Sequence, residues 1–405
     1  MQDWLAEAAR KRPQHTAIAA GGAELSYEEL DERVALRARD LAPGELVAID
    51  EPPGLEFAER LHACWRAGAV AMPLAPGAAA APARQAPAPG TALVIQTSGT
   101  SGEPKRVELS FENLEASAAA SADALGVDPD DRWLCPLPLH HVGGLSVLVR
   151  CAINATTALV HPRFDTERVK KEFEAGGATL ASLVPTMLAR LRHAGLRRTP
   201  GLRAIALGGG PAPPGLLDWA ARTGIPVVPV YGLTESASQI VAGVPGRPLR
   251  GVELRIGRDG ELLVRGAMVA RQSRDADGWL HTGDAGHLDA DGRLHLSGRL
   301  KELIVTGGEN VAPAEVEAVL GEHPAVADAG VVGLADPEWS EAVTAFVVLR
   351  APAGPEELRH FCRERLDRHK VPKQIHVVHE LPRNAAGKLL RDRLAQMAPL
   401  ESPPS

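Results

Sequence analysis

One segment of the chain combines the residue types that can wrap a polyphosphate. The strand-like run at residues 92–96 leads directly into Thr97, Ser98, Gly99, Thr100, Ser101, Gly102, Glu103, Pro104 and Lys105. Backbone N–H groups, hydroxyls and one ammonium in such a loop can surround phosphate oxygens. It is not a Walker loop, because Glu103 and Pro104 separate the last glycine from Lys105. A plain surface loop is the alternative, since Gly, Ser and Thr gather in loops, so this segment alone leaves phosphate binding open.

Five further motifs follow in a fixed order. They are Tyr231-Gly232-Leu233-Thr234-Glu235, His281-Thr282-Gly283-Asp284, Gly298-Arg299-Leu300-Lys301, Gly307-Gly308-Glu309-Asn310 and Asn384-Ala385-Ala386-Gly387-Lys388. Together with the loop at 97–105, this ordered set resembles the adenylate-forming superfamily of acyl-CoA synthetases, peptide-synthetase adenylation domains and luciferases. The resemblance covers about residues 91–394. It implies an acid–thiol ligase that forms acyl-AMP from a carboxylic acid and ATP, releases pyrophosphate, and passes the acyl group to coenzyme A.

The resemblance assigns the phosphate contacts. Attack of a carboxylate on the α-phosphorus of ATP requires cations and oriented N–H groups, because charge develops on two phosphate groups at once. The loop at 97–105 would hold the β- and γ-phosphates, while Thr234 and Glu235 would reach the α-phosphate and its Mg²⁺. A carboxylate beside phosphates suits Mg²⁺. A solvated glutamate at a helix start is the alternative for Glu235.

The nucleoside contacts also follow from the resemblance. Tyr231 resembles the ring that stacks on adenine, although a lone tyrosine after an apolar strand could equally belong to the core. Asp284 resembles the aspartate that accepts hydrogen bonds from the ribose hydroxyls, and Arg299 lies near the same sugar. The turn of Gly208, Gly209 and Gly210 would line the adenine and acyl pockets, or serve only as a strand-to-helix turn.

A second half-reaction is implied by the C-terminal motifs. Lys301 occupies the hinge position of the family, and Lys388 would bridge the α-phosphate and the substrate carboxylate during adenylation. Rotation of the small domain about the hinge would then bring Gly307, Gly308 and Glu309 to the pantetheine tunnel. An ordinary surface lysine is the alternative for Lys388. The thiol of coenzyme A is the nucleophile, so no cysteine of the protein is required.

The identity of the acid is suggested by another stretch. Residues 137–146 resemble the acyl-pocket motif in which the second histidine, His141, lines the substrate cavity beside Gly209. The runs HHVGGLSVLVR, LVPTMLARL, LGGGPAPPGLL and YGLTESASQIV are similar to the o-succinylbenzoyl-CoA synthetase family of menaquinone biosynthesis. Arg150, nine residues after His141, matches an arginine of that family placed to meet the carboxylate that does not react. A surface helix arginine is the alternative.

The pattern of apolar runs predicts an α/β fold. Strand candidates alternate with helix candidates at 111–125, 186–192 and 216–222, which favours a mainly parallel sheet. Asp259-Gly260 and Asp291-Gly292 indicate hairpins in a closing antiparallel part. An α+β pattern follows, with helices at 314–320 and 356–366. We expect a large domain at 1–298, a hinge at 299–301, a small mobile domain at 302–397 and a tail at 398–405.

The composition limits the classes of partner that the protein is expected to bind. A net charge of -7 argues against nucleic acid, and the uncharged runs are broken by Gly and Pro, so no membrane insertion is expected. Four scattered cysteines fit a reducing cytoplasm. A small carboxylic acid, ATP and coenzyme A are the expected partners, and a homo-oligomer stays open.

Two other functions stay open. The segments before residue 97 and between 241 and 281 are short for the superfamily, so the protein could activate another aryl or short-chain acid, for coenzyme A or for a carrier protein. A non-catalytic nucleotide-binding relative is the remote alternative. Such a chain should have lost Lys388, Glu235 or Asp284, and all three are present.

Overall fold

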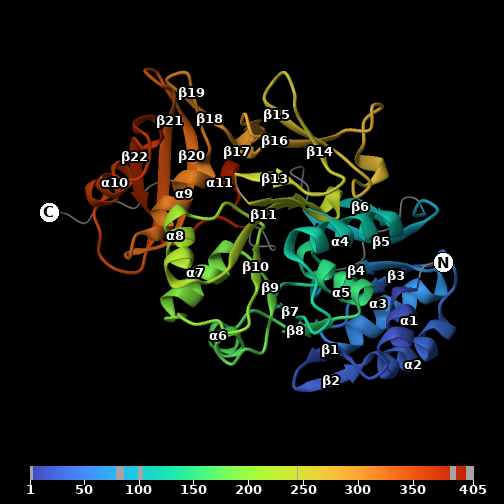
Figure 1. Cartoon of the computed structure of the whole chain (residues 1–405). Helices are drawn as coiled ribbons and strands as arrows, with labels where there is room; N and C mark the ends of the chain where they lie inside the picture. The colour runs from blue at the N-terminus through green and yellow to red at the C-terminus, as the bar shows by residue number, and fades with distance from the viewer. Residues whose placement is uncertain (1–2, 79–85, 99–103, 244, 384–388, 398–405) are drawn as a thin grey trace.

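A computed structural model describes residues 3–78, 86–98, 104–243, 245–383 and 389–397. Its largest feature is a 13-stranded sheet of order β14-β15-β16-β17-β13-β12-β11-β10-β9-β7-β8-β1-β2 (Figure 1). Its strands are β1 (Thr16–Ala20), β2 (Ala23–Ser26), β7 (Arg132–Cys135), β8 (Thr157–Val160), β9 (Leu180–Leu183), β10 (Ala204–Leu207), β11 (Val227–Leu233), β12 (Ser238–Gly243), β13 (Gly246–Pro248), β14 (Glu253–Ile256), β15 (Glu261–Arg265), β16 (Leu280–Leu288) and β17 (Leu294–Arg299).

The direction of the strands changes at β11. The strands from β1 through β8, β7, β9 and β10 to β11 are parallel to one another. From β11 through β12 and β13 to β17, β16, β15 and β14, each pair is antiparallel. Asp259-Gly260 and Asp291-Gly292 connect β14 to β15 and β16 to β17, as expected. The predicted α/β class, with a parallel sheet and a closing antiparallel part, is confirmed.

A second sheet of four strands carries both ends of the phosphate loop. Its order is β3 (Leu46–Ile49), β4 (Val70–Pro73), β5 (Thr91–Ser98) and β6 (Pro104–Ser110). One shared core joins both sheets to the helices between them, since it contains Leu61, Leu93, Leu145 and Val160. The helices nearby are α1 (Trp4–Lys11), α2 (Tyr27–Arg37), α3 (Leu55–Ala67), α4 (Phe111–Leu125) and α5 (Val142–Asn154).

Three helices cover the other face of the parallel strands. They are α6 (Thr166–Glu174), α7 (Pro185–His193) and α8 (Pro214–Thr223). Their apolar residues, such as Phe173, Leu188 and Leu216, form a core with Ile205 and Leu183 of the sheet. Pro185 and Pro214 begin two of these helices, where a proline costs no hydrogen bond.

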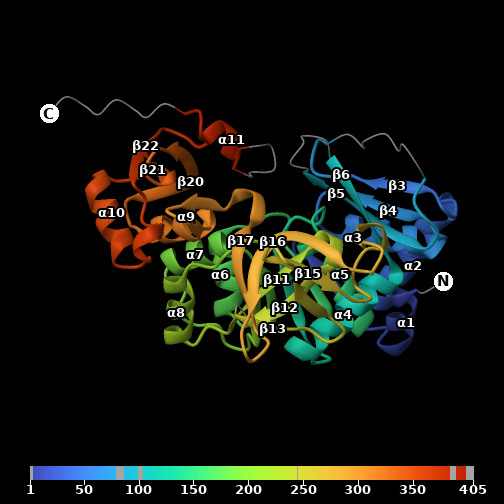
Figure 2. The ribbon, with the colours of Figure 1, turned by 90° about the horizontal axis from the view of Figure 1, so that it is seen from above.

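The C-terminal part has a sheet and a core of its own. Its elements are β18 (Ile304–Thr306), β19 (Glu309–Val311), α9 (Pro313–Glu322), β20 (Val326–Asp336), β21 (Ser340–Leu349), α10 (Pro355–Arg363), β22 (Gln374–Val377) and α11 (Arg391–Leu394). The helix expected at 356–366 ends at Arg363, and the N–H groups of Arg365 and Leu366 both donate to the carbonyl of Cys362 beyond its end. Figure 2 shows this part and the β3–β6 sheet flanking β16 and β17. Short 3₁₀ turns lie at Ala38–Asp40, Thr234–Ser236, Arg271–Ser273, Leu300–Glu302 and Arg368–Lys370.

Two further features concern the whole chain. Each of the four cysteines is buried and carries a free thiol. Among the described residues, no helix combines the length and the apolar character needed to cross a membrane.

Candidate active site

Asp284 lies at the centre of the candidate nucleotide site. It is only 7% exposed, on β16, directly opposite Arg299 of β17. Its Oδ2 accepts a hydrogen bond of 2.7 Å from the Tyr231 hydroxyl, and its Oδ1 lies 3.0 Å from Nε of Arg299. The structure therefore brings together three residues that the sequence analysis assigned to the nucleoside, from β11, β16 and β17.

The electrostatics of this cluster are dominated by burial. Desolvation raises the pKa of Asp284, and the hydrogen bond from Tyr231 and the charge of Arg299 oppose that shift only in part. Glu302 and Glu235 add to the rise, which places both carboxylates within electrostatic reach of Asp284. Burial also raises the pKa of Tyr231, so its hydroxyl keeps its proton and remains a donor. A nucleotide would meet here a carboxylate that is costly to ionise and that gains from additional hydrogen-bond donors.

The turn before Asp284 is held by a carboxylate that the sequence analysis did not single out. Glu261 accepts a hydrogen bond from the N–H of Gly283 at 2.8 Å and lies 2.7 Å from Nδ1 of His281. The Thr282 hydroxyl donates to the carbonyl of Leu262 at 2.6 Å. Gly283 has φ +69°, a conformation that favours glycine. Spacing alone gave no signal for Glu261, because it lies on the neighbouring strand β15, well before the motif in the chain.

The phosphate loop connects the antiparallel pair β5 and β6. Thr97 and Lys105 are paired across this hairpin, and the Thr97 hydroxyl donates to the carbonyl of Lys105 at 3.2 Å. Lys105 is exposed, so its side chain is accessible to a phosphate. Strand β5 ends at Ser98. Four expected phosphate ligands, Gly99, Thr100, Ser101 and Gly102, lie outside the described residues.

The chain makes a tight turn after β11. A Cβ on Gly232 would lie 1.9 Å from the carbonyl oxygen of Ser238, so no larger residue fits. Thr234 and Glu235 follow in a 3₁₀ turn, in which the Ser236 hydroxyl accepts from the N–H of Leu233 at 3.0 Å. The carbonyl of Glu235 accepts from the N–H of Ala270 at 2.7 Å. The backbone of the Thr234–Glu235 turn is therefore fixed from both sides, while the Glu235 side chain stays partly exposed.

Several expected pocket residues follow the carboxyl ends of parallel strands, the edge where open α/β sheets bind ligands. Gly208 and Gly209 follow β10, and Cβ atoms on them would lie 2.9 Å from Val230 and 3.1 Å from Val184. Gly210 is exposed and unhindered. His141 follows β7, caps the start of α5 and lies against His140, with ring centroids 4.3 Å apart. The pKa of His140 falls to about 4, first through desolvation and then through His141.

Arg150 is buried, so the interpretation as a surface helix arginine is wrong. It is 2% exposed, and its Nε and one terminal nitrogen have no hydrogen-bond partner among the described residues. Its guanidinium lies 5.3 Å from the Trp133 ring centroid. Burial lowers its pKa to about 10, which leaves it charged at neutral pH. A buried cation without a partner is costly, and a ligand carboxylate would relieve that cost.

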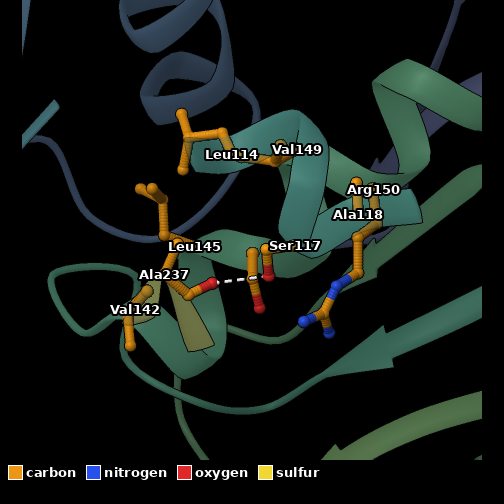
Figure 3. Close-up of a pocket in the computed structure, with 9 residues that line it drawn as sticks. Leu114, Ser117, Ala118, Val142, Leu145, Val149, Arg150 and Ala237 are labelled. Atoms are coloured by element: carbon orange, nitrogen blue, oxygen red, sulfur yellow. Dashed lines mark hydrogen bonds between the residues drawn. The ribbon is translucent and has the colours of Figure 1, made fainter. Parts of the chain in front are cut away.

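A small cavity lies between Arg150 and Ala237, the residue that follows the Thr234–Ser236 turn. It has a volume of about 10 Å³ and is lined by α4, α5 and Ala237 (Figure 3). Ala237 follows that turn with φ +52°, and its carbonyl accepts a hydrogen bond of 2.7 Å from the buried Ser117 hydroxyl. The space holds about one water molecule. Arg150 and the residue that ends this turn thus line the same cavity.

The C-terminal part supplies the remaining predicted residues. Lys301 is exposed in the 3₁₀ turn after β17. Gly307 and Gly308 form the β18–β19 turn, with φ +60° and +85°, and Glu309 begins β19. Lys388 lies outside the described residues. Shortly after it in the chain, Arg391 lies 2.9 Å from Glu302 and also pairs with Glu317.

The donor set fits one divalent ion that is held partly by phosphates. The described residues contain no group of three His, Cys, Asp or Glu side chains that could hold a metal ion. Glu235, on its fixed turn, offers one carboxylate, and Mg²⁺ commonly binds through one or two carboxylates together with substrate phosphates.

Comparison with known proteins identifies the family of the chain. The sequence matches the AMP-binding enzyme family over residues 5–86 and 78–272, and the AMP-binding enzyme C-terminal domain over 315–388. A 2-succinylbenzoate–CoA ligase of Bacillus cereus is 36% identical over 474 aligned positions, covering 98% of each chain. One from Bacillus licheniformis is 44% identical over 332 residues, or 75% of this chain and 69% of that protein.

Solved structures give the same result. The o-succinylbenzoate CoA synthetase of Bacillus subtilis, in complex with the acyl-adenylate intermediate OSB-AMP, has a TM-score of 0.89 at 34% identity and 99% coverage of both chains. A double mutant of that enzyme, bound with its product analogue OSB-NCoA, has a TM-score of 0.71 at 34% identity, covering 98% of this chain and 99% of that one. The chain belongs to the AMP-binding enzyme family, and its relatives within that family include 2-succinylbenzoate–CoA ligases.

Proposed function

We propose that the protein is an ATP-dependent 2-succinylbenzoate–CoA ligase of menaquinone biosynthesis. The observation that supports this most directly is the cluster of Tyr231, Asp284 and Arg299, which lies within electrostatic reach of Glu235 and Glu302. The 36% identity to a ligase of this name, over 98% of both chains, supports the same substrate.

The reaction has two steps. An oxygen of the acid's carboxylate attacks the α-phosphorus of ATP, the bond to the β-phosphate oxygen breaks, and pyrophosphate leaves. The thiol sulfur of coenzyme A then attacks the acyl carbon, AMP leaves with the bridging oxygen, and the thiol proton passes to water. Mg²⁺, held by Glu235 and the phosphates, would offset charge on the leaving pyrophosphate.

The chain's own groups position the nucleotide. Thr97 to Lys105 and Thr234 would bind the phosphates, and Asp284 would accept the ribose hydroxyls with Arg299 beside it. Because Tyr231 and Arg299 already hold the Asp284 carboxylate, little reorganisation is needed when the ribose binds. Gly208 to Gly210, with their absent side chains, would leave room for adenine and the acyl group.

Arg150 would select the diacid. Its unpaired N–H groups in a buried position favour a ligand that brings a second carboxylate, because a charged partner would satisfy donors that are otherwise unmatched among the described residues. His141 would also line the acyl pocket. The cavity beside Arg150, at about 10 Å³, must widen to admit the acid.

The C-terminal part would act as a mobile domain. We propose boundaries at 1–298, 299–301, 302–397 and 398–405, because the core around Val316, Val331 and Val343 is built within the C-terminal part alone. Lys388 would contact the reacting groups in adenylation, and the Gly307–Glu309 turn would line the path of pantetheine. Use of ATP and coenzyme A, with four free cysteines, fits a cytoplasmic enzyme.

The test is pyrophosphate release with ATP and Mg²⁺ against a panel of acids, with and without coenzyme A. We expect preference for 2-succinylbenzoate and a thioester product that forms only with coenzyme A. Preference for another acid would keep the chemistry and reject the substrate. If no acid of the panel gives pyrophosphate release although the protein still binds nucleotide, the protein is a non-catalytic nucleotide-binding relative.

A further inference from the structure

A hydrogen bond joins α8 of the large part to α9 of the C-terminal part. The carboxylate oxygen Oε1 of Glu322, the last residue of α9, accepts from the N–H of Gly215 at 2.9 Å. The two residues are 107 positions apart in the sequence, and the hinge positions 299–301 lie between them. Figure 1 shows α8 next to α9.

The N-terminus of α8 offers one amide for this contact. Pro213 and Pro214 have no N–H group, so Gly215 carries the first free amide of the helix. Leu216 donates to the carbonyl of Pro213 at 3.0 Å, and the N-cap position, Pro213, provides no side-chain hydrogen bond. The first amide and the positive end of the helix dipole together favour an anionic acceptor.

The Glu322 carboxylate occupies the space that a Cβ at Gly215 would need. A Cβ there would lie 2.6 Å from Oε1 and 3.0 Å from both Oε2 and Cδ of Glu322. The glycine does not have a positive φ, so the helix itself does not demand it. An alanine, which is otherwise favoured in a helix, would require the Glu322 carboxylate to shift.

This structure is more similar to the solved acyl-adenylate complex than to the solved complex with the product analogue. The TM-score is 0.89 against the acyl-adenylate complex and 0.71 against the double mutant with the product analogue, although both cover at least 98% of this chain. We propose that Glu322 is a positioning residue, whose hydrogen bond to Gly215 holds the C-terminal part in the arrangement that forms the acyl-adenylate. The proposal rests on the function proposed above.

The consequence is a specific effect on one half-reaction. Loss of a charge-assisted hydrogen bond at a helix N-terminus changes an equilibrium by about tenfold. Without it, the C-terminal part leaves the adenylating arrangement more often, so adenylation slows. Attack of coenzyme A on a supplied acyl-adenylate does not need the contact, so its rate stays equal or rises.

The experiment measures both half-reactions in the full chain for Glu322→Ala, Glu322→Gln and Gly215→Ala. Asp218→Ala is the control, since it removes an exposed carboxylate from α8, the helix of Gly215. We expect adenylation to fall about 5- to 10-fold in Glu322→Ala and Gly215→Ala, less in Glu322→Gln, and not in the control. The thioester step should keep its wild-type rate or exceed it. Equal rates in all variants, or equal losses in both steps, would overturn the proposal.

A second readout does not depend on catalysis. Cysteines introduced at the exposed residues Glu112 and Arg363 can carry spin labels on the two parts, because the four natural cysteines are buried. The distance distribution should broaden in Glu322→Ala and Gly215→Ala and stay unchanged in Asp218→Ala. An unchanged distribution in the first two would reject the contact's role. If the wild type fails to activate 2-succinylbenzoate, the proposed function is rejected, and the labels still decide on Glu322.

Discussion

The hydroxyl of Tyr231 donates a hydrogen bond of 2.7 Å to Asp284, although three strands lie between β11 and β16 in the order of the sheet. Four strand spacings in a flat sheet amount to about 19 Å, far more than a tyrosine and an aspartate can bridge. The antiparallel part must therefore curl back over the end of β11. The hydrogen bond joins the two sides of that curl at the candidate nucleotide site.

Replacement of Tyr231 by Phe tests this joint. The ring remains, but Asp284 loses one donor, so its ionised form becomes costlier and the ribose contact weakens. We expect the KM for ATP to rise about 5- to 10-fold, as the loss of about 1 kcal/mol implies, while the KM for the acid stays the same. Steady-state kinetics with each substrate varied in turn give the answer. An unchanged KM for ATP would show that the hydroxyl does not support nucleotide binding.

The pKa of Asp284, raised chiefly by its burial, predicts a pH dependence. If the ionised carboxylate accepts the ribose hydroxyls, kcat/KM for ATP should fall in acid at a pH above the usual 3.8. Arg299→Gln removes a charge that lowers this pKa, so the acid limb should move to higher pH. If kcat/KM for ATP falls at the same pH in Arg299→Gln as in the wild type, Asp284 is not the group whose protonation causes the fall.

The raised pKa of Asp284 also makes the free energy of unfolding depend on pH, and in the opposite direction to activity. The folded state binds the Asp284 proton more tightly than the unfolded state, so this stabilising contribution is present in acid and is lost as pH rises through the raised pKa. Asp284→Asn should therefore unfold at a higher denaturant concentration than the wild type at pH 7, while its KM for ATP increases. Urea unfolding at pH 5 and pH 7 measures the difference, which should be larger at pH 7.

Arg150→Met should separate stability from substrate binding. It removes a buried charge without a described partner, so the ligand-free protein should gain about 1 kcal/mol or more of unfolding free energy. The KM for 2-succinylbenzoate should rise more than the KM for a monoacid such as benzoate. Arg150→Lys should restore part of the preference for the diacid. A loss of stability, or equal effects on both acids, would contradict the role of Arg150.

Lys388→Ala should nearly abolish adenylate formation and still allow a supplied acyl-adenylate to react with coenzyme A. The reason is that the proposed contact of its ammonium with the α-phosphate and the carboxylate exists only in the first step. Single-turnover measurements of the two half-reactions check this. Equal loss in both would remove Lys388 from the adenylating site.

The sequence predicted the parts of the fold that have strong local signals. Helix α4 was expected at its observed bounds of 111–125, and the Asp-Gly turns of the antiparallel part were placed correctly. The N-terminal elements, from α1 to β4, were not assigned from the sequence. A signal was present at Ser26 and Glu29, which form a capping box at the start of α2.

The site was predicted where motifs carry it and missed where sheet order creates it. The association of Asp284 with Arg299 follows from adjacent strands, and both were named. The bond from Tyr231 depends on the curl of the sheet, and Glu261 and Glu322 make contacts 22 and 107 positions away, which spacing does not reveal. The stacking of Tyr231 on adenine stays a prediction.

The burial of the cysteines bears on the chemical safety of the intermediate. An acyl-adenylate is an electrophile that any accessible thiolate would attack. Burial raises the pKa of Cys64, Cys135 and Cys151 to about 12 and that of Cys362 to about 11, so at neutral pH almost none of them is ionised. The folded protein therefore presents no thiolate of its own that competes with coenzyme A for the acyl-adenylate.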